Sequence, residues 1–280
     1  MSKSINVALL GNPNTGKTSI FNALTGLSQK VGNYPGITVE KKEGISKLDR
    51  INKGYILDLP GTYSLNASSM DESIVINLLL NKKNKDYPDV AVLIADVENL
   101  KRNLLLFTQL KDLGIPTLLV INMSDLMTRK GISLNIPLLE QKLETKIALV
   151  STRNNEGLDE LKKLIINYRK LPTQPLISLR SINENYFKNL EKTFPDQPLY
   201  KLWLVITQDI NYTKVERNNI SNTSGFKTES SSSIKKLQQK ETIKRYQYIN
   251  GILKQALKVD HKNAKDFRSR LDRIFIHGFW

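Results

Sequence analysis

A short segment near the N-terminus has the residue types and the spacing that bind a nucleoside triphosphate. It reads G-N-P-N-T-G-K-T from Gly11 to Thr18, between an apolar run and an apolar-periodic segment. Glycines permit the turn, and the N–H groups of such a loop converge on anionic oxygens at a helix N-terminus. Lys17 can reach the β- and γ-phosphates, and the Thr18 hydroxyl can bind Mg²⁺. The spacing predicts a P-loop, although the pattern also occurs by chance. The residues expected to contact nucleotide here are Gly11, Asn12, Pro13, Asn14, Thr15, Gly16, Lys17, Thr18 and Ser19.

Two later segments fit the phosphate end of the same site. Residues 27–36 are rich in turn formers and predict a mobile loop, and Thr38 beyond it can complete a Mg²⁺ shell when a γ-phosphate is present. Asp58 ends an apolar strand and can hold Mg²⁺ through water, and the Gly61 N–H can contact the γ-phosphate. The alternatives are an ordinary strand threonine and a strand-terminating turn. The residues expected to contact nucleotide in these segments are Gly36, Ile37, Thr38, Asp58, Leu59, Pro60 and Gly61.

A third group of residues has the chemistry to recognise guanine. Asn122-Met123-Ser124-Asp125 follows an apolar strand, and an aspartate there can accept from guanine N1–H and the exocyclic amine. Adenine lacks those donors, so it would leave the buried carboxylate unpaired. Backbone groups after the last strand are expected to cap the guanine edge. The residues expected at the base are Asn122, Met123, Asp125, Ser151, Thr152 and Arg153.

The elements that must position these residues alternate along the first 171 residues. Continuous apolar runs predict buried parallel strands, and periodic segments between them predict helices on both faces. The fold class is therefore α/β, with a mostly parallel sheet flanked by helices. Strands are expected at residues 5–10, 39–48, 53–59, 90–96, 115–121 and 146–150, and helices at 19–26, 69–82, 100–113, 134–143 and 158–169.

The last third of the chain has a different pattern. Pro172 and Pro175 mark a boundary, so the sequence predicts one domain at 1–171 and a small all-α subdomain at 172–280. Helices are expected at 182–194, 199–209 and 234–257, with a mobile polar loop at 211–233. The longest helix is expected to present one apolar face that includes Ile243, Tyr246, Ile249, Ile252, Leu253 and Leu257.

Composition limits the classes of protein that fit. The 280 residues contain no cysteine, which excludes disulfides and thiolate metal sites, and no run reaches the roughly 18 apolar residues of a membrane span. The net charge of +15 favours an anionic partner such as a nucleotide, a nucleic acid or a membrane surface. From Ile234 onward, twelve Lys and Arg stand against four acidic residues, which suits either a membrane-facing segment or a solvated helix.

Taken in order, these motifs resemble the translation-factor-like small GTPases. The amino-acid sequences of the motifs are similar to those in the cytosolic GTPase domain of FeoB ferrous-iron transporters. The similar segments are Gly11–Thr18, Val31–Glu40 (V-G-N-Y-P-G-I-T-V-E), Asp58–Leu65 (D-L-P-G-T-Y-S-L) and Asn122–Asp125. The resemblance is close over residues 1–170. It implies a P-loop GTPase fold, the cofactors GTP or GDP with Mg²⁺, and a location at the cytoplasmic face of the bacterial inner membrane.

The same resemblance implies partners for the chain. It implies a membrane-embedded transport domain C-terminal to it, with residues 267–280 as a juxtamembrane tail, and it leaves open a homo-oligomer, with trimers through the membrane domain. No nucleic-acid partner is expected from it.

The resemblance also implies roles in hydrolysis. Asn14, Lys17, Thr38 and Gly61 are the expected catalytic residues, and Asn14 matches the position that holds K⁺ in potassium-activated GTPases. A loop-stabilising role for Asn14 is the alternative. Thr62 and Tyr63 stand where many GTPases have a water-orienting glutamine, so slow hydrolysis is expected. Met123 replaces a lysine whose stem packs on loop and base, which predicts modest affinity and fast GDP release.

Two other functions remain open from the sequence. The basic charge also suits a ribosome- or RNA-associated GTPase, but no G-x-x-G loop of a KH module follows residue 172. The third hypothesis is a nucleotide-binding regulatory module whose hydrolysis hardly matters.

Overall fold

A seven-stranded sheet forms the centre of the N-terminal two-thirds of the chain. The computed structural model describes residues 3–26, 29–34, 38–66, 69–208, 220 and 226–260. The strand order is β2-β3-β4-β1-β5-β6-β8, in which β2 and β3 are antiparallel to their neighbours and the others are parallel. The bounds are β1 Lys3–Gly11, β2 Gln29–Asn33, β3 Glu40–Lys47, β4 Asn52–Asp58, β5 Val90–Asp96, β6 Thr117–Asn122 and β8 Ile147–Leu149.

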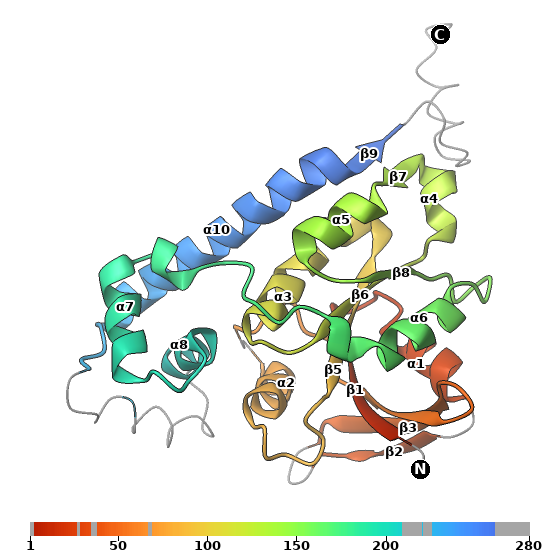
Figure 1. Cartoon of the computed structure of the whole chain (residues 1–280), viewed down its shortest axis with the longest axis horizontal. Coiled ribbons are helices and arrows are strands. Elements are labelled where there is room, and N and C mark those ends of the chain that lie inside the picture. Colours follow the sequence, from red (N-terminus) through yellow and green to blue (C-terminus); the bar gives the residue numbers. More distant parts are fainter. Residues whose placement is uncertain are drawn as a thin grey trace, which may run out of the picture.

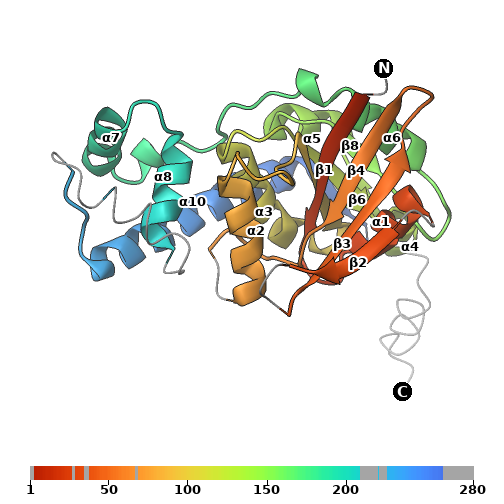
Figure 2. The same cartoon turned by 90° about the horizontal axis from the view of Figure 1, so that it is seen from below.

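Alternating side chains of the strands build two apolar layers. Val7 and Leu9 of β1 face α1 (Lys17–Thr25) and α6 (Leu158–Ile166), whereas Ala8 and Leu10 belong to the core beneath α2 (Met70–Leu80), α3 (Leu100–Asp112) and α5 (Ile136–Leu143). Figures 1 and 2 show helices on both sides of the sheet. Central strands β5 and β6 are buried on both faces, as expected for apolar parallel strands. The predicted α/β class is confirmed.

Two features of this part differ from the sequence interpretation. The predicted mobile loop 27–36 contains the edge strand β2, which escaped detection because Val31 is 62% exposed and no apolar alternation marks the segment. Between the guanine motif and α5 lie a short helix, α4 (Asp125–Lys130), and a three-residue strand, β7 (Ile132–Leu134). Short elements of this kind form through tertiary pairing rather than through local periodicity.

The C-terminal part is helical and packs around aromatic residues. The bounds are α7 Glu184–Thr193, α8 Leu199–Thr207 and α10 Ser231–Ala256, followed by the short strand β9 Leu257–Val259, which pairs antiparallel with β7. Short 3₁₀ turns lie at Tyr168–Lys170 and Leu179–Ser181, and another lies before α3 at Val97–Asn99. The rings of Tyr186, Phe187 and Trp203 meet edge-on at centroid distances of 5.1 to 6.3 Å, and Phe226 lies against Tyr186. Among the helices of the described residues, none has the length and apolarity needed to cross a bilayer.

The longest helix also differs from its prediction. Ser230 caps α10, so Ser231 to Ser233 begin the helix, although they were assigned to the polar loop. Ile249, Ile252 and Leu253 are buried as expected, but Ile243 is 57% exposed. Within the predicted loop, residues 211–219 and 221–225 lie outside the described residues, and so do residues 261–280, which include the predicted tail 267–280. The apolar stripe is therefore narrower than predicted, and two charged residues take part in the buried face.

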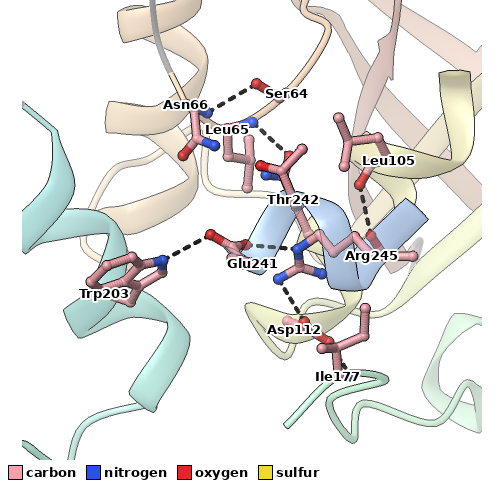
Figure 3. A network of polar contacts seen from close by, with 12 residues as sticks. Ser64, Leu65, Asn66, Leu105, Asp112, Ile177, Trp203, Glu241, Thr242 and Arg245 are labelled. Atoms are coloured by element: carbon pink, nitrogen blue, oxygen red, sulfur yellow. Dashed lines mark hydrogen bonds and ion pairs between the residues drawn. The ribbon is translucent and has the colours of Figure 1, made fainter. Parts of the chain in front are cut away.

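Those charged residues form a buried network between α3 and the helical part (Figure 3). Arg245 of α10 is 0% exposed, and its Nη2 lies 2.8 Å from Asp112 Oδ2 while its Nε donates to Glu241 Oε1 at 2.7 Å. Trp203 Nε1 donates to the second oxygen of Glu241 at 2.8 Å. Burial raises the pKa of Asp112, and the Arg245 charge opposes that rise. Removing the Arg245 side chain would leave the buried carboxyl groups of Asp112 and Glu241 without a compensating positive charge.

We therefore expect Arg245→Met to lower the free energy of unfolding in urea by about 3–5 kcal/mol, because it leaves buried acids uncompensated. Lys240→Met on the exposed face of the same helix is the matched control and should change that free energy by less than about 0.5 kcal/mol. Equal small effects of both substitutions would show that the buried acids do not depend on Arg245 for compensation.

Candidate functional site

The loop between β1 and α1 has the backbone conformation that its glycines and asparagine predict. Gly16 is the N-cap of α1 with φ 80°, and Asn14 is left-handed with φ 66°. A Cβ on Gly16 would lie 2.2 Å from the side-chain nitrogen of Asn122, and one on Gly11 would lie 2.5 Å from the Ile94 carbonyl oxygen. Both glycines are therefore required by close approach, and Gly16 also by its backbone angle.

Three side chains converge where the loop enters α1. Lys17 forms an ion pair with Asp58 Oδ1, and the Thr18 hydroxyl lies 3.3 Å from Asp58 Oδ2. Asp58 is the last residue of β4 and only 6% exposed. Because β4 pairs in parallel with β1, the carboxyl ends of the two strands bring Asp58 beside the loop. The hydroxyl and carboxylate are oxygen ligands of the kind that Mg²⁺ prefers, so these residues fit that ion.

The segment after Asp58 is fastened to the loop by backbone hydrogen bonds. Leu59 N donates to Leu9 O at 3.1 Å, and Thr62 N donates to Gly11 O at 3.1 Å. A Cβ on Gly61 would lie 3.1 Å from the ring of Pro13. The glycine of D-L-P-G therefore lies against the loop, as its predicted role at the γ-phosphate requires.

A cavity of about 440 Å³ opens between these segments and the start of β3. Its lining includes Lys17, Thr18, Thr38, Asp58 and Gly61, so the predicted Mg²⁺ and phosphate residues share one space. Gly36 and Ile37, also predicted to contact nucleotide, lie outside the described residues.

The ends of the loop that bears Thr38 are held together. Tyr34 N donates to Val39 O at 3.0 Å, and the Tyr34 side chain is 8% exposed. Burial, reinforced by Asp86 and Asp58, raises the pKa of Tyr34, so its hydroxyl stays protonated.

The predicted guanine-reading residues meet at the ends of β6 and β8. Asn122 Nδ2 donates to the Thr15 carbonyl at 2.9 Å, which ties the base motif to the phosphate loop. The Ser151 hydroxyl donates to Asp125 Oδ1 at 2.8 Å, and Ser124 N donates to Val150 O at 3.1 Å. The sequence interpretation assigned only backbone groups to 151–153, so the hydroxyl that orients Asp125 is an addition.

Met123 corrects one expectation. Its terminal methyl lies 3.8 Å from the position that a Cβ on Gly16 would take, and its backbone is left-handed with φ 59°. The side chain therefore still packs on the phosphate loop, and only the ammonium group of a lysine is lost. The predicted loss of packing on the loop was wrong, because methionine has a stem of similar length. The modest affinity and fast GDP release stay predictions.

Other polar groups at the site were missed from the sequence. Glu72 Oε1 accepts from Tyr63 N at 3.3 Å, Ser69 caps α2, and Asp71 lines the cavity. Ser69-x-x-Glu72 is the capping-box pattern, so a signal for this arrangement was present. Asn12 is 3% exposed, and neither of its side-chain polar atoms has a partner within the described chain.

Comparison with known proteins agrees with this geometry. A family model described as Ferrous iron transport protein B matches residues 5–165. The Fe(2+) transporter FeoB of Leptospira biflexa is 36% identical over 292 residues, covering 98% of this chain and 41% of that protein. The Staphylococcus aureus (strain COL) FeoB is 33% identical over 288 residues, covering 98% of this chain and 42% of that protein. The chain thus spans about two-fifths of the length of these relatives.

Solved structures agree as well. The cytosolic domain of the T. maritima FeoB iron transporter in GDP form I aligns with a TM-score of 0.79 at 30% identity, covering 92% of this chain and 100% of that one. Its GMPPNP form has a TM-score of 0.79 at 30% identity, covering 91% and 99%. The sheet, the loop and the motif order define a P-loop GTPase fold. Within that class, the chain belongs to the FeoB family of ferrous iron transport proteins.

The contact between Gly16 and Asn122 can be tested against a matched glycine. Gly114, after the end of α3, also has a positive φ, 73°, but a Cβ there would meet only the Thr173 carbonyl oxygen at an ordinary contact distance of 3.8 Å. Gly114→Ala should lower the free energy of unfolding by about 1–2 kcal/mol through backbone strain alone. Gly16→Ala should cost about 1–3 kcal/mol more, because it also breaks the buried Asn122–Thr15 hydrogen bond. Urea unfolding of both variants measures the difference, and equal losses would exclude a role for the contact.

Proposed function

We propose that this chain is the GTP-binding and slowly GTP-hydrolysing domain of a ferrous iron transporter, and that its nucleotide state gates iron uptake. One observation carries the proposal: Lys17, Thr18 and Asp58 converge at the C-terminal end of the loop Gly11–Thr18, and Asn122 of the base motif bonds to the Thr15 carbonyl of the same loop. A triphosphate and a guanine base can therefore be bound by one continuous surface. GDP and GMPPNP forms of the T. maritima domain support the same ligand class.

At the phosphate end, the loop N–H groups and the α1 N-terminus offer positive potential to the anion. Lys17 exchanges its partner Asp58 for β- and γ-phosphate oxygens when nucleotide binds. Thr18, Thr38 and Asp58 are the residues that would hold Mg²⁺, which neutralises phosphate charge when bound. Gly36, Ile37, Leu59 and Pro60 complete the proposed contacts to nucleotide, and Gly61 N–H contacts the γ-phosphate.

At the base end, Asp125 accepts from guanine N1–H and the exocyclic amine. The hydrogen bond from Ser151 occupies Asp125 Oδ1 and fixes the plane of the carboxylate. Thr152 and Arg153 are partly or fully exposed and border the base, where their backbone groups can approach it. Specificity for guanine then follows from the unpaired acceptors that adenine would leave.

Hydrolysis is proposed to be slow because Thr62 and Tyr63 offer no carboxamide to orient water. Thr62 is 0% exposed and its N–H is engaged with Gly11 O, so it cannot replace that group. The side-chain oxygen of Asn14, which is exposed at the loop turn, is a suitable ligand for K⁺. A potassium ion bound by Asn14 would supply positive charge to the phosphates, as an arginine finger does in other GTPases.

The chain covers about two-fifths of the length of its relatives, so the partner of this domain is proposed to lie in the remainder. We propose that a membrane-embedded transport part follows this chain, that the chain lies at the cytoplasmic face of the bacterial inner membrane, and that the protein forms a homo-oligomer through the membrane part. The proposed boundary at Pro172 separates the nucleotide-binding domain from the helical subdomain. The chain at this boundary is held to α3, because Lys111 Nζ donates to the Pro172 carbonyl and, at 2.9 Å, to Glu144 O.

Potassium dependence tests the catalytic proposal. GTP turnover by this chain should be several-fold faster in KCl than in NaCl at equal ionic strength. Asn14→Gly should remove that difference, because it deletes the ligand oxygen and tolerates the left-handed backbone at this position. Binding of a fluorescent GTP analogue by the same variant separates catalysis from affinity. Equal rates of the unmodified chain in both salts would contradict the potassium site.

Base recognition has its own test. Asp125→Asn should weaken GDP binding at least ~10-fold, because an amide cannot accept both guanine donors, and should improve binding of xanthosine diphosphate. Asp159→Asn is the matched control, since that side chain is 96% exposed on α6. Unchanged GDP affinity of Asp125→Asn would place the base elsewhere.

A further inference from the structure

Strand β2 forms one border of the seven-stranded sheet, and its outer side is open. Among the described strands it pairs only with β3. Figures 1 and 2 show it at the border of the sheet, beyond β3. Four of its five residues are exposed, and Val31 at its centre is 62% exposed. An edge strand of this kind offers backbone N–H and C=O groups to a further strand.

The ladder between β2 and β3 determines which residues direct their backbone groups to β3. Tyr34 N donates to Val39 O at 3.0 Å, and these two residues continue the register in which Asn33 lies opposite Glu40. Hydrogen-bonded pairs alternate with non-bonded pairs along an antiparallel ladder. Every second residue before Tyr34 is therefore bonded to β3, and the residues between them direct their N–H and C=O to the open side.

The outward-directed residues of β2 are Gln29, Val31 and Asn33. In the register with β3 they lie opposite Gly44, Lys42 and Glu40, as non-bonded pairs. Their three N–H and three C=O groups have no partner in any of the described strands. They form a regular row of donors and acceptors along the open side of the sheet.

The spacing of these three residues is self-complementary. If a second copy of β2 lies antiparallel with Val31 opposite Val31, then Gln29 of each copy lies opposite Asn33 of the other. All three are then hydrogen-bonded pairs, so every outward N–H and C=O of both strands obtains a partner. A two-fold axis through Val31 generates this arrangement, and such an axis gives a closed dimer.

The side chains fit the same register. The two exposed Val31 side chains meet across the axis and remove apolar surface from water. Lys30 lies opposite Gly32 of the other copy, so the two lysine charges are not directly opposed. Within Gln29–Asn33 there is no proline, and Lys30 is the only charged residue, so the strand has little that blocks edge pairing. An unrelated strand would have to match this row by chance, whereas a second copy matches it by symmetry.

We propose that β2 is an interface through which two copies of this chain pair edge to edge and join their sheets. The interface is small, so isolated chains associate weakly. The pairing becomes strong where other contacts already hold two copies close together, because the local concentration of the second β2 is then high. None of the residues of β2 belongs to the proposed nucleotide site, so this inference does not depend on the proposed function.

Removal of one outward N–H is the first test. Val31→Pro leaves the ladder with β3 intact, since proline is tolerated on an edge strand where its position faces solvent. Val31→Ala is the matched control, because it also loses the isopropyl group but keeps the N–H. Loss of both hydrogen bonds at the axis should raise the dimer dissociation constant at least ~10-fold in Val31→Pro relative to Val31→Ala. Sedimentation equilibrium at protein concentrations up to about 1 mM measures both constants.

Cross-linking tests the position of the interface. The chain has no cysteine, so one substitution introduces a single thiol. Val31→Cys places two thiols in a bonded pair with Cα atoms about 5.5 Å apart, a distance that a disulfide spans. Ile51→Cys is the matched control, since Ile51 is also 62% exposed but lies between β3 and β4. With oxidised glutathione as the oxidant, the disulfide dimer should form at least ~10-fold faster from Val31→Cys.

A mixture of two variants tests the register. A Cβ on Gly32 would meet nothing within 4 Å, so Gly32→Cys is accommodated. In the proposed register it lies about 4.5 Å, between Cα atoms, from residue 30 of the other copy. Two copies of Lys30→Cys have their thiol-bearing residues about 7–8 Å apart, which is too far for a disulfide. Mixing Lys30→Cys with Gly32→Cys should therefore give mainly the mixed disulfide.

The opposite results would overturn the proposal. A chain that stays monomeric up to about 1 mM has no such interface. A dimer equally stable in Val31→Pro and Val31→Ala would use another surface, and equal cross-linking of Val31→Cys and Ile51→Cys would reflect random collision. Disulfides within each variant, rather than between Lys30→Cys and Gly32→Cys, would exclude the two-fold register.

Discussion

The contact between the Gly11–Thr18 loop and Asn122 is the constraint on which the rest of the site depends. The loop has room for a phosphate-binding turn only if Gly16 lacks a side chain, because Asn122 occupies the adjacent space and bonds to the Thr15 carbonyl. This places the ends of β1 and β6 in a fixed relation. The parallel sheet then brings Asp58 to the same edge, since β4 pairs with β1 on its other side. The residues proposed to bind phosphate and those proposed to bind the base are thus held in a fixed arrangement by the strands that carry them.

A second constraint fixes the helical part against the sheet. Helix α3 supplies three polar side chains near its C-terminal end, and each has a distant partner. Gln109 accepts from Leu65 N, Lys111 donates to the carbonyls of Glu144 and Pro172, and Asp112 pairs with Arg245. Burial of such groups is costly unless every partner is in place. The arrangement therefore specifies one relative position of the elements more than it adds stability.

Leu65, four residues beyond Gly61, connects the segment after the D-L-P-G motif to two helices. Its N–H bonds to Gln109 of α3, and its carbonyl accepts from Gln208 at the end of α8, at 2.9 Å. The segment after the proposed γ-phosphate motif is thus held by α3 and α8. The segment after the proposed guanine motif is held by α10 and β9. Both ends of the proposed nucleotide site consequently lie close to elements of the C-terminal third of the chain.

Elements and motifs that depend on local sequence were predictable, whereas elements that depend on contacts with distant residues were not. Buried strands such as β5 and β6 were predictable because their apolar runs are long. The motifs Gly11–Thr18, Asp58–Gly61 and Asn122–Asp125 could be recognised because phosphate and guanine demand particular groups at fixed spacing, and their contacts to nucleotide stay predictions. Strand β2 and the strands β7 and β9 were not predictable, since their stability comes from pairing with distant segments. The exposed side chains of Val31 and Ile243 were not predictable either, because the exposure of a residue on an edge strand or a helix face depends on which elements pack against it.

The sequence by itself determined the α/β class, the order of the motifs and the family, because these depend on local periodicity and on short chemical patterns. Only the tertiary structure decided that Arg245 is buried beside Asp112, that Ser151 orients Asp125, and that β9 returns to pair with β7. Each of these is a contact between residues far apart in the chain, and its free energy exists only once the sheet has brought both partners together.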